Sequence, residues 1–321
     1  MVHCGMRSLP LVLCFAVASA AAQSQYPSKP VRLIAGAPPG TPGDVVARII
    51  SEPLSAALGQ PVVIENRPGA IGTIALGAVS KAPADGHTLG AITMPQTIAP
   101  HLLPKLPYEI ASDLAPVRQL AWVSNVLVVR PSAPFRSVAE LVAAAKARPQ
   151  SLTFASGGNG TPAHVAGELF GLNAAIEMRH VPFNGAVAGV AAVMGEQVDM
   201  MFAIAPAVIP HLKAGKLRAL ATPAPSRLPA LPDLQTLAEL GYAVDVRDWT
   251  GIVAPAQTPK PVIRRLESAI ATVLAKDEVK QRLAAAGFEP AESSADAFGK
   301  LIRTELQKWG KVVNQAKIKP D

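Results

Sequence analysis

The chain has 321 residues, a net charge of +7, 17% charged residues and only 4% aromatic residues. Its basic residues are scattered, and so few aromatic side chains cannot line a nucleic-acid groove with stacking platforms. These values exclude nucleic acid as an expected partner. The length is sufficient for two domains that each bury a core of their own.

The first 22 residues have the order of a secretory signal. Arg7 precedes an apolar stretch at residues 9–17, and small residues follow up to Ala22, where we expect cleavage. The apolar stretch is shorter than the ~20 residues that a membrane-spanning helix needs. Both cysteines, Cys4 and Cys14, lie in this segment. We therefore expect a soluble, exported protein without disulfides.

The following residues alternate between strand-like and helix-like patterns in two series. In the first series we expect strands at 31–35, 62–65 and 88–92 and helices at 44–58 and 74–82. In the second we expect strands at 126–129, 152–155, 178–181, 198–202 and 217–221 and helices at 137–147, 161–172, 186–194 and 207–214. Such alternation is typical of βαβ units around a parallel sheet, so each series predicts one α/β lobe.

The C-terminal part of the chain is expected to return to the first lobe. A proline-rich stretch carries one short predicted helix at 233–240, and residues 249–255 lead back to the first lobe. Helices are predicted at 262–275, 277–286 and 295–315. We thus expect lobe 1 to comprise residues 23–127 and 250–321, and lobe 2 to comprise residues 128–249.

Residues 36–44 read GAPPGTPGD and connect the first predicted strand to the first helix. Their glycine spacing fits neither the phosphate motif G-x-x-x-x-G-K-S/T nor the dinucleotide motif G-x-G-x-x-G. A glycine-rich turn into a helix still leaves N–H groups unpaired where the helix dipole favours an anion. Taken alone, the loop is either a turn or half of an anion site.

Residues 154–164, FASGGNGTPAH, repeat this design in the second series. Thr161 suits a helix N-cap and Pro162 suits the first turn. Because open α/β sheets bind ligands at the carboxyl ends of their strands, we expect the two loops to face each other across one cleft. The recurrence favours ligand binding, although a turn remains the alternative for each loop.

Motifs for catalysis and for metal binding are weaker. The chain contains no G-x-S-x-G and no H-E-x-x-H motif. His164 and Glu168 fall short of the three or four ligands that zinc requires. Asp44 and Asp199 are candidates for a carboxylate pair, but capping and turn formation suit them better. We predict no catalytic residue, no metal and no cofactor.

Over nearly the whole mature chain the sequence resembles the Bug-type extracytoplasmic solute receptors of the tripartite tricarboxylate transporter family. Matching stretches lie at residues 26–30, 39–44, 58–69, 84–89, 156–161 with His164, 180–183, 197–202, 215–221 and 251–259. The resemblance implies a two-lobed, hinged periplasmic-binding-protein fold of the Venus flytrap kind, type II-like. It also implies that a small carboxylate is captured between the lobes and presented to a membrane transporter.

The resemblance also implies a set of ligand-binding residues. By position they are Ala37, Gly40, Thr41, Gly43 and Asp44 in the first loop, Ser156, Gly158, Asn159, Gly160 and Thr161 in the second, and Asn184 and Asp199 at later strand ends. The first loop departs from the family pattern P-G-G-S/G-T/S-D at Thr41, Pro42 and Gly43. Since Pro42 has no N–H to donate, the identity of the carboxylate stays open.

Three roles remain open for such a chain. The leading expectation is a monomeric periplasmic carboxylate receptor that serves the membrane subunits of a tripartite transporter. A ligand-sensing partner of a membrane signalling protein would use the same fold and the same site. The third role is an exported enzyme that uses His164 or Asp199 as a base.

Overall fold

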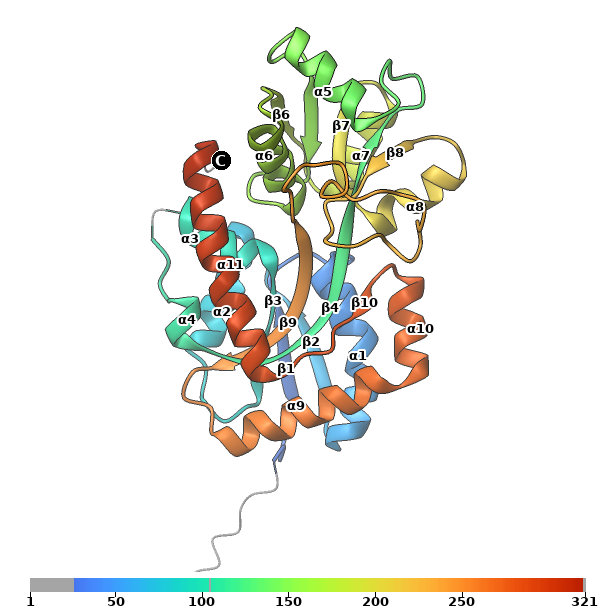
Figure 1. The fold of residues 1–321 in the computed structure, drawn as a ribbon. Coiled ribbons are helices and arrows are strands. Elements are labelled where there is room, and N and C mark those ends of the chain that lie inside the picture. The colour runs from blue at the N-terminus through green and yellow to red at the C-terminus, as the bar shows by residue number, and fades with distance from the viewer. Residues whose placement is uncertain (1–25, 104, 320–321) are drawn as a thin grey trace, which may run out of the picture.

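The computed structural model describes residues 26–103 and 105–319. It contains a ten-stranded sheet with the strand order β2-β1-β3-β9-β4-β7-β5-β6, and β8 and β10 also pair with β4. Figure 1 shows that the elements gather into two lobes, with β4 and β9 passing between them. The predicted signal segment, residues 1–22, lies outside the described residues.

The first lobe is built on a parallel arrangement of β1 (Val31–Ala35), β2 (Val62–Asn66) and β3 (Thr88–Thr93). Its helices are α1 (Pro42–Leu58), α2 (Thr73–Ser80), α3 (Met94–Leu102) and α4 (Ile110–Asp113), with a 3-10 turn at Ala70–Gly72. Helix α1 buries Val46, Ile50 and Leu54 because they recur on one face at helical spacing. It ends at Gly59, whose φ of +75° suits glycine.

The second lobe repeats this plan. Its strands are β5 (Thr153–Ser156), β6 (Arg179–Pro182), β7 (Met200–Ile204) and β8 (Arg218–Ala221), and its helices are α5 (Val138–Ala147), α6 (Pro162–Ala174), α7 (Ala186–Met194) and α8 (Ala205–Lys213). Strands β6 and β7 run parallel to β5 on either side of it. The carboxyl ends of these strands therefore share one edge, and the loops after them lie together.

Two strands join the lobes, β4 (Leu114–Val129) and β9 (Arg247–Pro255). Strand β4 pairs with β9 from Leu114 to Ser124 and with β7 from Asn125 to Val129. The strand predicted at 126–129 is thus the end of a much longer one, whose polar residues obscured the apolar pattern. The expected lobe limits at 127/128 and 249/250 stay a prediction.

The C-terminal elements are α9 (Lys260–Ala275), α10 (Asp277–Ala285), β10 (Glu289–Pro290) and α11 (Ala295–Ala316). Helix α11 packs against α3, β4 and α6, so it contacts both lobes (Figure 1). Beneath it one apolar core continues from α3 to α6 and includes the fully buried Phe298 and Trp309. None of the described helices has the length and apolar character to cross a membrane.

Helices also differ from the sequence-based expectation. The helix predicted at 233–240 is wrong: Thr236 and Glu239 exchange hydrogen bonds as in a helix start, but the chain forms turns and reaches Gly241 at φ +88°. Helix α3 was not predicted, although Thr93 and Gln96 form a capping box at its start.

Candidate functional site

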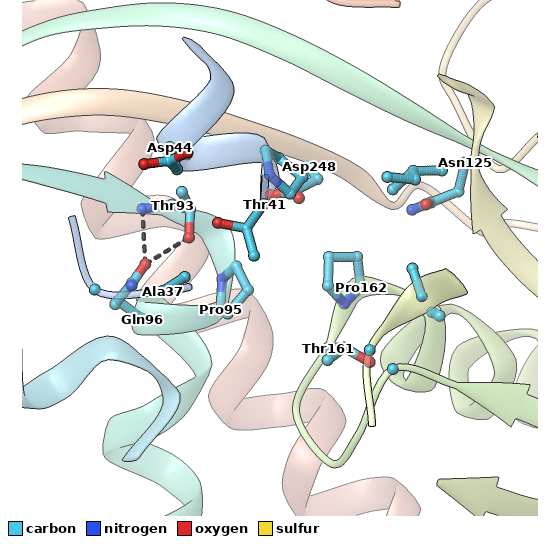
Figure 2. Close-up of a pocket in the computed structure, with 18 of the residues that line it drawn as sticks. Ala37, Thr41, Asp44, Thr93, Pro95, Gln96, Asn125, Thr161, Pro162 and Asp248 are labelled. Carbon is cyan, nitrogen blue, oxygen red and sulfur yellow. Dashed lines mark hydrogen bonds between the residues drawn. The ribbon is translucent and has the colours of Figure 1, made fainter. Parts of the chain in front are cut away.

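A cavity of about 250 Å³ lies between the two lobes (Figure 2). Its polar side chains are Thr41, Asp44, Thr93 and Gln96 from the first lobe, Thr161 from the second, and Asn125 and Asp248 from the strands that join them. The rest of its lining is glycine, alanine, proline and larger apolar side chains. The cavity thus combines an apolar body with a few polar groups, as small-molecule sites commonly do.

The first predicted loop forms one side of this cavity. Thr41 is the N-cap of α1, with φ −77° and ψ 159°, and Pro42 occupies the first turn. The Thr41 hydroxyl donates to the carbonyl of Pro38 at 2.8 Å. Gly40 precedes it at φ +84°, in the left-handed region that favours glycine. These contacts fix the direction from which the chain enters α1.

Asp44 holds this loop from inside the helix. Its carboxylate accepts the Gly40 N–H at 2.9 Å, the Asn66 amide at 2.8 Å and the Arg48 Nε at 3.0 Å. Burial would raise the pKa of Asp44, but the hydrogen bonds from Arg48, Gly40 and Asn66 outweigh it and hold the pKa below its usual range. Although Asp44 borders the cavity, its oxygens already serve the loop, so we interpret it as a positioning residue.

The second loop has the same local geometry. Thr161 caps α6 with φ −77° and ψ 158°, and Pro162 follows it in the first turn. The Thr161 hydroxyl donates to the carbonyl of Gly158 at 2.7 Å. The Gly160 N–H, at φ +72°, donates to Nδ1 of His164 at 3.2 Å. Figure 2 shows Thr161 and Pro162 on one side of the cavity, opposite Thr41 and Pro95.

The cavity is therefore bordered by two helix starts of matching construction. Gly43 in α1 and Ala163 in α6 both line it, each two residues after its N-cap. First-turn N–H groups have no acceptor within their own helix, and the helix dipole adds positive potential there. Pro42 and Pro162 contribute no N–H. An anion placed between the two starts would meet donors from both lobes.

Other predicted site residues shape the second loop without lining the cavity. The Ser156 hydroxyl lies 2.6 Å from Nε2 of His180 and accepts the Gly158 N–H at 3.0 Å. Gly158 and Gly160 adopt positive φ angles of 120° and 72°. Asn159 lies between them in the same loop, and Gly157 supplies the contact with the cavity.

Two further predicted residues lie away from the cavity. Asn184 is exposed, while its neighbour Gly185 lines the cavity. Asp199 accepts the N–H and the hydroxyl of Thr153, both at 2.8 Å, and pairs with Arg130 at 3.4 Å. Both Thr153 and Asp199 stand at the amino ends of their strands, opposite to the loops. The structure therefore does not bring Asp199 together with Asp44.

Sequence reasoning missed the residues that close the cavity at the joining strands. The pKa of Asp248 is raised to about 7. Burial is the largest cause and the charge of Glu305 adds to it, whereas hydrogen bonds from the Trp249 and Met94 N–H groups lower the pKa. Asn125 is fully buried, and neither its side-chain oxygen nor its nitrogen has a hydrogen-bond partner among the described residues. The sequence signal that could have identified Asn125 is a polar side chain inside an otherwise apolar strand.

Comparisons with known proteins identify the family. The model described as "Tripartite tricarboxylate transporter family receptor" matches residues 46–318. Protein BugT of Bordetella pertussis is 35% identical over 308 residues, which are 94% of each chain. The structure of R. palustris Rpa4515 with adipate is 32% identical with a TM-score of 0.81, covering 92% of this chain and 100% of that one.

A further structure, MatC (Rpa3494) from Rhodopseudomonas palustris with bound malate, is 31% identical with a TM-score of 0.79 and covers 90% of this chain and 100% of its own. The chain belongs to the tripartite tricarboxylate transporter family of receptors. It has the mixed α/β periplasmic-binding-protein fold, as predicted. It is accordingly a solute-binding receptor and not an enzyme.

Proposed function

We propose that this member of the tripartite tricarboxylate transporter receptor family captures a small carboxylate between its lobes in the periplasm and delivers it to the membrane subunits of a transporter. The observation that carries the proposal is the pair of matching Gly-Thr-Pro helix starts, at 40–42 and 160–162, on opposite sides of one cavity. The similar chains solved with adipate and with malate support the ligand class.

In this proposal the carboxylate lies between the first turns of α1 and α6. The N–H groups near Gly43 and Ala163 donate to its oxygens, because no acceptor within either helix competes for them. Ala37, Thr41 and Thr161 lie beside it in the cavity lining, where the two threonine hydroxyls hold the loops by donating to Pro38 and Gly158. Gly40, Ser156, Gly158, Asn159 and Gly160 act indirectly, by shaping the two loops. Asn184 and Asp199 stay predictions from sequence.

The proposal also covers the export of the protein and the closing motion of its two lobes. The chain is made with a signal segment that is cleaved after Ala22, and the mature receptor acts as a monomer. Residues 23–127 with 250–321 form one lobe and residues 128–249 the other, and they close on the ligand by bending at β4 and β9. Ligand closure of this hinge kind is common among two-lobed binding proteins.

Thermal unfolding of the mature chain, residues 23–321, with a panel of mono-, di- and tricarboxylates tests the proposal. A carboxylate at ~100 times its Kd should add about 2.7 kcal/mol to the free energy of unfolding. The variant Ala163→Leu places a larger side chain in the cavity lining and should abolish that shift, whereas Val63→Leu on an exposed strand position should keep it. Stabilisation by a neutral solute, with no response to any carboxylate, would contradict the proposal.

A further inference from the structure

Asp248 and Asn125 both face the cavity because of how β4 pairs with β9. In this antiparallel pair Asp248 is directly opposite Val123. Asn125 is two residues beyond Val123, so it points to the same face of the sheet as Asp248. Both side chains line the cavity, and Figure 2 shows Asp248 near Thr41 and Asn125 farther to the right, beyond Pro162.

Asn125 has hydrogen-bonding capacity that no described residue uses. Its side chain is fully buried, and neither the amide oxygen nor the amide nitrogen has a protein partner. Buried polar side chains are nearly always paired in folded proteins, because an unpaired one costs free energy. An amide in this situation on a cavity wall indicates a polar group of the ligand as its partner.

Asp248 offers acceptors at the same place. Its side chain is buried, and Oδ1 accepts the Trp249 N–H at 2.8 Å. The Met94 N–H is a second donor, and because a carboxylate has about four acceptor sites, about half of its capacity is left. None of the described residues that line the cavity is Lys or Arg. No basic side chain of the lining pairs with this carboxylate, so its remaining acceptor sites are open to a donor on the ligand.

The charged groups around Asp248 also favour a hydrogen-bond donor over an anion at this place. Glu305 on α11 is acidic and is held by the Trp309 Nε1–H at 2.8 Å and by Lys308 at 3.6 Å. Asp44, the other carboxylate that borders the cavity, is neutralised by Arg48. The lining around Asp248 is thus acidic, whereas the first-turn N–H groups of the two helix starts favour an anion.

We propose that Asp248 and Asn125 form a second polar subsite, which binds a hydrogen-bond-donating substituent of the ligand, an ammonium or a hydroxyl group, beside its carboxylate. The inference rests on the proposed carboxylate site and names the ligand class within it. The carboxylate lies at the two helix starts, and the donor lies at Asp248 and at Oδ1 of Asn125. A second carboxylate at this place would be repelled by ionised Asp248.

Succinate, malate and aspartate test the inference because they share one carbon skeleton and differ in a hydrogen, a hydroxyl or an ammonium group. Calorimetric titration at about pH 8, above the raised pKa of Asp248, should show malate or aspartate binding at least ~10-fold more tightly than succinate, about 1.4 kcal/mol. The comparison of malate with aspartate identifies the donor. If the four-carbon series does not bind, adipate, 2-hydroxyadipate and 2-aminoadipate repeat the test.

Two variants separate recognition from a structural role. Asp248→Asn and Asn125→Leu should each reduce the preference to within about threefold while succinate still binds, because the donor loses an acceptor. Asp245→Asn is the matched control, since this carboxylate is 65% exposed and outside the cavity. A variant that weakens all three ligands equally indicates a structural role and overturns the inference.

The pH profile gives an independent readout. Because ionised Asp248 is the better partner for a donor, the affinity for aspartate or malate should rise as the pH increases through about 7. A profile without this rise, or a wild-type protein that binds the unsubstituted acid best in both series, contradicts the inference. If no carboxylate binds at all, the proposed function fails; if carboxylates bind without preference, only the subsite fails.

Discussion

The loop at residues 36–44 and the loop at residues 156–164 reach one backbone geometry with different side chains. Thr41 and Thr161 have φ and ψ angles within one degree of each other, and both hydroxyls donate three residues back. The glycine before each threonine donates its N–H to the side chain four residues ahead. That acceptor is the carboxylate of Asp44 in one loop and the imidazole of His164 in the other.

This difference changes what stabilises each loop. Asp44 is ionised and pairs with Arg48, so the first loop depends on charge and on hydrogen bonds to a carboxylate. His164 accepts through Nδ1 and stacks on His180 with ring centroids 3.8 Å apart. The second loop therefore depends on ring packing and on a nitrogen that carries no proton. The two lobes present similar helix starts, but they should respond differently to mutation and to acid.

Replacing Asp44 should have the largest effect. Asp44→Ala leaves the Gly40 N–H without its acceptor, removes one of the two acceptors of the Asn66 amide and leaves Arg48 without its carboxylate partner, so we expect a loss of about 3 kcal/mol in the free energy of unfolding. Chemical denaturation measures it, with the half-exposed Asp85→Ala as the control. Because the folded pKa of Asp44 is lowered, its contribution is complete above about pH 3.9 and is lost as the pH falls through the folded pKa. Equal losses in the two variants would contradict the role given to Asp44.

The two glycines provide a matched pair of variants. Both Gly40→Ala and Gly160→Ala force a side chain into the left-handed region, at a cost of about 1–2 kcal/mol. A Cβ at Gly160 would also lie 2.8 Å from Cδ1 of Leu102, whereas one at Gly40 has no heavy atom within 4 Å. Gly160→Ala should therefore lower the melting temperature more than Gly40→Ala. The reverse order would mean that the second loop is less tightly packed than the first.

Mild acid should destabilise the second loop before the first. Burial first, and then the neighbouring His164, lower the pKa of His180 to about 3. Near pH 6.5 His180 binds a proton in the unfolded chain but stays neutral in the folded protein. Its contribution to stability is therefore complete above pH 6.5, and the free energy of unfolding falls below that pH by at most ~1.4 kcal/mol per pH unit. Unfolding curves from pH 7 to pH 5 measure this slope. It should decrease in His180→Gln and persist in the exposed control His101→Gln.

The smallest effects belong to the cap hydroxyls. Thr41→Val and Thr161→Val remove one hydrogen bond each, to Pro38 and to Gly158, and each should cost about 1 kcal/mol of stability. Because the geometry is shared, the two losses should agree within experimental error. Calorimetry with the best carboxylate then shows whether both helix starts contribute equally to affinity. A loss of affinity confined to one variant would show that the ligand rests on one lobe.

Much of the local structure was predictable from the sequence. The predicted helix at 186–194 coincides with α7, because an uninterrupted pattern of small and apolar residues specifies it. Both loops were found at their strand ends, since glycine, proline and a capping threonine are local signals. Helix α3 had a capping box at Thr93 and Gln96 that was overlooked. The helix expected at 233–240 failed because Gly241 ends it after one turn.

The sequence by itself determined the alternating elements, the two loops and the family, all of which are encoded in neighbouring residues. Only the tertiary structure decided which polar side chains meet. Asp199 looked suitable but lies at the amino end of its strand, against Thr153. Asp248 and Asn125 showed no motif, yet the register of β9 on β4 brings them to one face of the sheet. Such pairing joins segments over 100 residues apart, and no local pattern encodes it.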